Sequence, residues 1–212
     1  MSDAFNHFQF SFFEDAYSAR NGLDTEALGQ LENEERAQAE DMLIRYLPDT
    51  RGVIGLGVLR SRRGEPLLVQ LFNAERQARR DSSSYSLVEL SKALWQIRPG
   101  SRLLAAVTEV LASSERDMQR MDAAMALSVL RRREAVDALV RSLDDPAELV
   151  RHQAARSLLV IYDLTGEADV MMKDREHTIF RVMSNDLAKR ESGKRDILAA
   201  IAGLPISTFM PS

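Results

Sequence analysis

The chain has 212 residues, 45% of them hydrophobic and 28% charged, a size that suits one elongated domain or at most two ordinary ones. It contains no cysteine, which excludes disulfide bonds, thiolate metal sites and a cysteine nucleophile. No apolar run approaches the roughly 20 residues of a membrane span, and the N-terminus lacks the basic-then-apolar order of a signal peptide. We therefore expect a cytoplasmic protein without a membrane partner.

Charge is distributed unevenly along the chain, although the formal net charge is only −4. Residues 1–50 hold 11 acidic residues and 3 arginines, a net charge of −8, and the remaining residues carry +4. An acidic N-terminal part would attract a basic partner. Solvated helix faces also produce such imbalances, so the charge pattern alone leaves both interpretations open.

The N-terminal segment is rich in phenylalanine, with five of the eight phenylalanines in the first 13 residues. Phe5, Phe8 and Phe12 have helical spacing, whereas Phe8, Phe10 and Phe12 alternate as on a strand, so periodicity does not choose between the two. These rings would serve either as an aromatic cap over the end of the core or as an exposed patch for a partner.

Helix formers dominate the chain, and glycine and proline are scarce. We assign residues 1–48 to an N-terminal helical cap, with helices from Asp24 to Leu31 and from the N-cap Asn33 to Leu47. Residues 49–164 should form paired helices at Thr50–Arg60, Glu65–Arg79, Ser84–Arg98, Ser101–Ala112, Glu115–Arg132, Glu134–Leu143 and Pro146–Leu164. Residues 165–212 should supply closing helices and a loose tail, with helices at Val170–Lys189 and Arg195–Leu204 and with Ile179, Phe180 and Val182 packed inward.

A helical pattern recurs after 31 residues. Its first copy is Arg120, Ala123, Ala124, Leu127 and Leu130, and its second copy is Arg151, Ala154, Ala155, Leu158 and Ile161. A fixed offset carried by small and apolar residues at helical spacing is typical of stacked helix pairs. The sequence therefore predicts an all-α fold, an α-solenoid (α-α superhelix) of stacked antiparallel helix pairs, as a single domain over residues 1–212.

The turn Asp144-Asp145-Pro146 and the segment Val150–Leu158 resemble a HEAT-like repeat, of the short bacterial variety also found in phycobilin lyase accessory proteins. In that family a turn aspartate and an arginine six residues later form a ladder between adjacent repeats; Asp145 and Arg151 have this spacing. Arg120 also fits, but Ser114 replaces the aspartate. The resemblance is strongest over residues 101–164. It implies protein binding on a concave surface lined by the second helix of each pair.

No catalytic or metal-binding constellation is visible. His7, His152 and His177 stand far apart without carboxylates at zinc-ligand spacing, and no HExxH, EF-hand, GxGxxG or P-loop pattern occurs. We therefore expect neither an enzyme nor a bound cofactor or metal.

Eight arginines fall at turns that follow a second helix, where stacking would align them on one edge as a candidate anion ridge: Arg60, Arg62, Arg63, Arg98, Arg102, Arg131, Arg132 and Arg133. Such a ridge would bind phosphate, nucleic acid or an acidic protein. Cations also favour helix C-termini for purely structural reasons, and no aromatic stacking pattern accompanies these arginines.

A second candidate surface follows from the helical register of the second helices. It is a column beside the core stripe, predicted to face the concave side and to bind protein, made of Lys92, Trp95, Met125, His152, Arg156 and Leu159. Trp, Met and Arg are enriched at interfaces. Trp95, the only tryptophan, would equally fit between repeats.

Three functions are compatible with these sequence features. The first is a non-enzymatic protein-recognition module, with an immunity protein that neutralises a basic toxin as a specific role and an adaptor or chaperone as others. The second is a nucleic-acid or phosphate binder using the arginine ridge. The third, an accessory bilin lyase-type protein, needs a pocket with a placed acid, for which the sequence offers no candidate.

Overall fold

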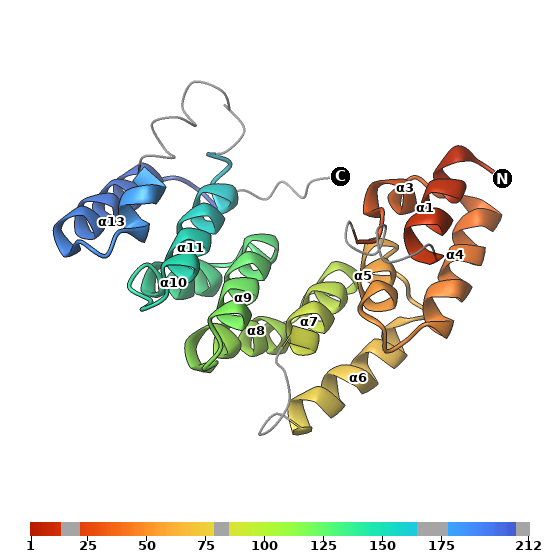
Figure 1. The fold of residues 1–212 in the computed structure, drawn as a ribbon. Coiled ribbons are helices and arrows are strands. Elements are labelled where there is room, and N and C mark those ends of the chain that lie inside the picture. Colours follow the sequence, from red (N-terminus) through yellow and green to blue (C-terminus); the bar gives the residue numbers. More distant parts are fainter. Residues whose placement is uncertain (14–21, 79–84, 165–177, 207–212) are drawn as a thin grey trace. The chain divides into compact units, whose positions relative to one another are not determined.

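A computed structural model describes residues 1–13, 22–78, 85–164 and 178–206 of the chain (Figure 1). Every regular element in these ranges is an α-helix, which confirms the predicted all-α class. The N-terminal part of the helix expected from Val170, residue His177 and the end of the tail lie outside the described residues. The chain forms two compact units, Met1–Leu103 and Leu104–Ser212, which are described separately. The single domain expected from the sequence stays a prediction.

The first unit is built from short helices that pack on their neighbours along the chain. Helix α1 packs on α3, α3 and α4 pack on α5, and α7 packs on both α5 and α6. Their bounds are α1 Asp3–Phe13, α3 Thr25–Gly29, α4 Asn33–Arg45, α5 Thr50–Val58, α6 Glu65–Ala78 and α7 Tyr85–Ile97, and α8, Ser101–Ser113, crosses from this unit into the second.

The phenylalanine-rich segment is helical. Phe5, Phe8 and Phe12 are buried at the i, i+3 and i+7 positions of α1, with ring centroids 6.0 Å apart for the first two and 5.6 Å apart for the last two. The rings of Phe12 and Tyr46 form a T-shaped pair with their centroids 4.7 Å apart. Phe10 lies on the other side of the helix and is exposed. Helical spacing therefore prevails over the alternating pattern because it puts three large rings into one core.

Helix starts in this unit follow local capping chemistry. Asp24 caps α3 by accepting from the Ala27 N–H at 2.8 Å, and Asp49 caps α5 by accepting from the Arg51 N–H at 2.9 Å. The predicted N-cap role of Asn33 is wrong by one residue. Glu32 occupies the cap position without a side-chain bond, and Asn33 begins α4 with a positive φ of 46°.

Helix α5 can approach α7 closely because its buried surface is made largely of glycine. A Cβ added to Gly57 would lie 2.7 Å from the Cα of Ala93 on α7, and a Cβ added to Gly55 would lie 2.4 Å from the Leu43 side chain. Glycine lowers helix propensity by about 1 kcal/mol. These positions tolerate it because contact with the neighbouring helices replaces the missing side chain.

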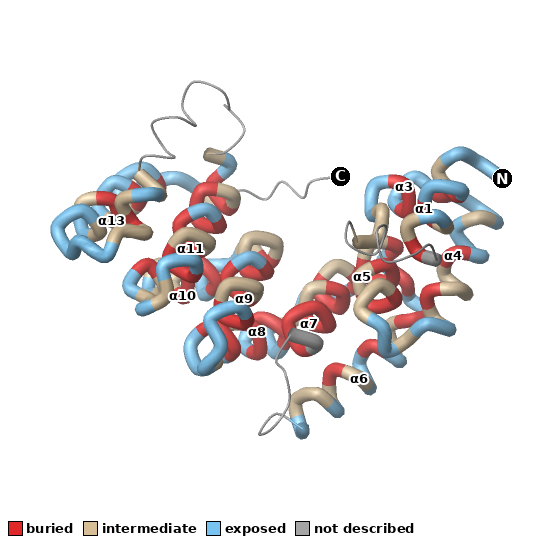
Figure 2. Tube along the Cα trace, viewed as in Figure 1, coloured by how far each residue is buried: buried red, intermediate tan, exposed pale blue. Residues whose placement is uncertain are grey.

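The second unit contains the 31-residue repeat. Helix α9 packs lengthwise beside α11, α10 packs on both, and α13 packs on α11. All ten repeated residues named above are buried, including both arginines, so the repeat marks the shared core of α9 and α11. Figure 2 shows that both helices also carry exposed segments. The bounds are α9 Asp117–Leu130, α10 Arg133–Ser142, α11 Glu148–Ile161 and α13 Leu187–Ile201.

The C-terminal helices differ from the prediction. Residues 178–183 are helical, and the helix is interrupted at residues 184–186. Asp186 then caps α13 by accepting from the N–H groups of Ala188 and Lys189. Val182 is buried as expected, but Phe180 is 63% exposed. Two residues rotate a helix by about 200°, so the two side chains leave on nearly opposite sides.

Gly57→Ala should lower the free energy of unfolding by about 1–3 kcal/mol, because the added methyl group overpacks the contact with Ala93. Gly29→Ala is the matched control. A Cβ there meets nothing within 4 Å, and the change should be neutral or stabilising by up to about 1 kcal/mol. Urea denaturation of the three proteins measures both effects, and equal midpoints for Gly57→Ala and the parent would contradict the close approach of α5 to α7.

Candidate functional site

Two arginine side chains fix the turns of the second unit. The Arg120 guanidinium on α9 reaches the turn before α11 and forms a bidentate ion pair with the Asp145 carboxylate. Its Nε donates to Oδ2 at 2.8 Å, and its Nη2 donates to Oδ1 at 2.9 Å. It also donates to Asp117 Oδ1 and to the main-chain oxygen of Ser114, both at 2.8 Å. The hydrogen bond with Asp145 raises the pKa of Arg120 further above its ordinary range, with burial opposing it. This pair links two successive helix pairs.

Arg151 makes the corresponding link one repeat later, but to main-chain carbonyls. Its Nη1 donates to Asp145 O at 2.8 Å and to Pro146 O at 2.9 Å, which repeats the contact of Arg120 with the carbonyl six residues before it. Its Nε donates to Val182 O at 2.9 Å, and its Nη2 donates to Met183 O. Burial and the neighbouring Arg190 charge lower the pKa of Arg151.

These contacts refine the expected ladder. The aspartate and arginine six residues apart, Asp145 and Arg151, meet through a main-chain oxygen, whereas the side-chain pair joins Asp145 to Arg120, 25 residues earlier. Ala147, not Asp145, occupies the cap position of α11. Asp145 instead accepts from the Ala147 N–H at 2.8 Å while it holds Arg120.

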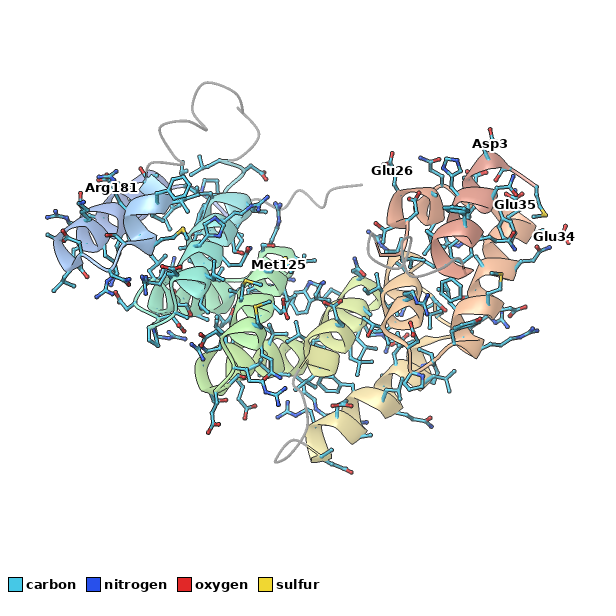
Figure 3. The ribbon with its side chains drawn as sticks, in the orientation of Figure 1. Asp3, Glu26, Glu34, Glu35, Met125 and Arg181 are labelled. Carbon is cyan, nitrogen blue, oxygen red and sulfur yellow. The ribbon has the colours of Figure 1, made fainter. Side chains whose placement is uncertain are left out.

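The same two helices expose large apolar side chains. Met118 and Met125 on α9 are 57% and 44% exposed, and Leu149 on α11 is 47% exposed. Met118 and Leu149 are 31 residues apart, so they occupy the same repeat position on adjacent helices, as the buried pairs do. Figure 3 labels Met125 on α9. We call this surface the methionine face; its residues are Met118, Met121, Met125, Leu149, His152 and Arg156.

The methionine face includes part of the column expected from the sequence. Met125, His152 and Arg156 lie on it, the first and last exposed and His152 half-buried. Met118 and Leu149 are not among the residues that the sequence predicts for a site, although their 31-residue separation is visible in it. An apolar position that repeats after 31 residues but lies outside the repeated core positions is the signal that could have identified them.

Two of the other three column residues, Trp95 and Leu159, are buried, and the third, Lys92, belongs to the first unit. Trp95 is 5% exposed and Leu159 is 3% exposed, so both are core residues of their units, and their expected place on a binding surface is corrected. The sequence allowed Trp95 to lie either on the binding column or between repeats, and in the structure its side chain is buried. Lys92 on α7 donates from Nζ to the buried Glu89 carboxylate at 2.9 Å and 3.1 Å.

His152 and Arg156 define the electrostatics of the methionine face. They are four residues apart on α11, and burial first, then the Arg156 charge, lower the pKa of His152 from its ordinary value of 6.5. His152 is therefore neutral at pH 7. Among the described residues the exposed Arg156 side chain makes no hydrogen bond or ion pair, so it supplies the positive charge of this face.

In the first unit, most arginines of the candidate ridge form ion pairs with acids of that unit. Arg62 and Arg98 both pair with Glu65, at 3.2 Å and 3.1 Å. Arg63 pairs with Glu40 and Asp41 at 3.1 Å and 2.7 Å.

Arg102 lies 5.5 Å from the centre of the Phe72 ring, and Arg60 is exposed. In the second unit Arg131 pairs with Asp163 and Arg133 with Asp137, while Arg132 is exposed and also has a partner. The ridge is therefore largely a set of ion pairs formed within each unit.

Three acidic side chains on the first unit have no such partner in the described part of the chain. Asp3 on α1, Glu26 on α3 and Glu34 on α4 are exposed and project outward (Figure 3), and no hydrogen bond or ion pair of theirs occurs among the described residues. Glu35 differs, because both the hydroxyl and the N–H of Ser2 donate to its carboxylate, the hydroxyl at 2.6 Å. These two hydrogen bonds lower the pKa of Glu35.

The described residues contain no group of three or more His, Asp or Glu side chains placed to hold a metal ion. No helix in that part of the chain has the length and apolar character needed to cross a membrane. The chain matched no protein-family model, no curated protein and no solved structure.

Arg120→Ala should lower the free energy of unfolding by about 3 kcal/mol, because it leaves the largely buried Asp145 carboxylate without its cation. Arg133→Ala removes an exposed pair with Asp137 and should change it by about 0.5 kcal/mol or less. Chemical denaturation of both variants tests the difference. Equal losses would show that the turn does not depend on the guanidinium.

His152 should titrate below pH 6.5, and Arg156→Gln should raise its pKa without restoring 6.5, because burial is the larger cause. The unfolded chain then binds more protons than the folded one below about pH 6.5, so His152 makes the fold less stable as pH falls from that value toward its folded pKa. Proton NMR of the imidazole measures the pKa. A midpoint at or above 6.5 in the parent protein would contradict this environment.

Proposed function

We propose that this chain is a non-enzymatic protein-recognition module, built as a HEAT-like α-solenoid, and that it binds its partner through the methionine face. The observation that carries the proposal is the exposure of large apolar side chains, Met118, Met125 and Leu149, on adjacent helices whose ten repeated core residues are buried. Burying one such side chain contributes about 1.5–3 kcal/mol. A patch of this kind on a folded surface is typical of an interaction site.

The residue types on this face suit protein recognition. Methionine is unbranched and polarizable, so it adapts to the shape of a partner. Methionine and arginine are enriched at interfaces, and Met118, Met121, Met125 and Arg156 bring both types to two neighbouring helices.

The stacked-pair architecture is supported by the packing of the second unit. Helix α9 lies against α11, α10 contacts both, and Arg120 and Arg151 each link a helix to the turn of the following pair. This agrees with the resemblance of residues 101–164 to HEAT-like repeats. In such a stack the second helices line one surface, which is where the methionine face lies.

The unpaired acids of the first unit favour a partner with a net positive charge. Asp3, Glu26 and Glu34 would increase the rate of encounter with such a protein. Neutralising a basic toxin, as an immunity protein does, is the specific role that this charge supports. Binding of nucleic acid through the arginine ridge has less support, because most of these arginines already have acidic partners.

A tagged chain should capture one stoichiometric protein from a lysate of the source cells, and Met125→Glu/Leu149→Glu should reduce its recovery at least about tenfold. Two carboxylates in place of exposed apolar groups remove the contact without touching the core. The capture is repeated with nuclease treatment and at raised salt, which weakens exposed charge pairs.

Leu67→Glu/Val69→Glu is the matched control, because Leu67 and Val69 are exposed to a similar degree, at 38% and 39%, on α6 of the other unit. It should capture the partner like the parent. Circular dichroism checks that both variants keep their helix content. Equal recovery by both variants would place binding elsewhere, and captured nucleic acid lost at high salt would favour the arginine ridge.

A further inference from the structure

The methionine face combines an apolar stripe with one unpartnered cation. Met118, Met121 and Met125 occupy positions i, i+3 and i+7 of α9, and Leu149, His152 and Arg156 occupy the same positions of α11. Among the described residues no group pairs with the Arg156 guanidinium. Seven residues of helix extend about 10 Å, and packed helix axes lie about 8–10 Å apart. The face thus has the length of two helical turns and the width of two helices.

This arrangement fits one kind of ligand structure. An amphipathic helix presents apolar side chains at i, i+3 or i+4, and i+7, and it docks by laying them between two neighbouring helices. On α11, Arg156 follows Leu149 and His152 at the C-terminal end of the methionine face. There its guanidinium would reach a charged side chain next to the apolar stripe of the bound helix.

The charges around Arg156 favour a carboxylate. Its guanidinium makes no pair among the described residues, and an arginine binds a carboxylate through two parallel hydrogen bonds. His152, neutral at pH 7, adds no competing charge.

We infer that the methionine face binds an amphipathic α-helix of a partner protein, with apolar side chains against Met118, Met125 and Leu149 and an aspartate or glutamate paired with Arg156. This rests on the proposed function and specifies the partner segment. The carboxylate is a local requirement, so it is compatible with a partner whose net charge is positive.

The test is selection from a display library of random peptides of about 16 residues, long enough for about four helical turns, on the full chain and in parallel on Arg156→Glu. The chain should enrich peptides with apolar residues at helical spacing and a bordering Asp or Glu. Arg156→Glu should enrich Lys or Arg at that border. Arg156→Gln should bind the acidic peptide about fivefold more weakly than the parent.

A second readout comes from the imidazole of His152. A bound carboxylate offsets the Arg156 charge, so the acidic peptide should raise the pKa of His152, and the same peptide with glutamine in place of the acid should raise it less. A ligand held elsewhere would leave this pKa unchanged.

Selected peptides that lack an acid, that keep it on Arg156→Glu, or that bind Met125→Glu/Leu149→Glu as well as the parent would overturn the inference. Failure to enrich any helical peptide would also overturn it. If the captured partner depends on Met125 and Leu149 but not on Arg156, the proposed function stands and the carboxylate assignment fails. If capture of the partner requires none of these three residues, the methionine face is not the binding site, and the proposed function fails as well.

Discussion

The pair between Arg120 and Asp145 joins α9 to the turn before α11 in the second unit. One guanidinium binds the carboxylate at two points while it also holds the start of its own helix through Ser114 and Asp117. A buried arginine needs such partners, because an uncompensated buried charge is strongly destabilising. The pair therefore fixes the turn before α11 relative to α9, and through it the two helices that carry the methionine face.

Close packing of α9 on α11 then fixes which side of each helix is buried and which side is exposed. Ala123 and Ala154, 31 residues apart, are both fully buried, and such small side chains let the helices approach. Residues at the opposite side of the same helical turns must face outward. Since Met118 and Leu149 occupy that side, the repeat that builds the core also builds an apolar surface, and this is the physical basis of the proposed recognition role.

The sequence predicts the core of the second unit well and its polar contacts poorly. The repeated alanines, leucines and arginines are buried as the spacing indicates, because a 3.6-residue period directly encodes one face. The partners of the arginines are not encoded locally: Arg63 pairs with acids 22 and 23 residues away. One helix is predicted to run through Asp186, the cap of α13, although Ser184, Asn185 and Asp186 are residue types that favour turns and N-caps. Trp95 could not be assigned, since a tryptophan beside a core stripe suits either a core or an interface.

The most direct measurement is methyl NMR of the chain labelled at its nine methionines, with and without the captured partner. If the methionine face binds the partner, the signals of Met118, Met121 and Met125 should shift or broaden, while that of Met42 on α4 should stay unchanged. Unchanged signals from the three α9 methionines in a saturated complex would contradict the account. A shift of Met42 alone would place the partner on the first unit.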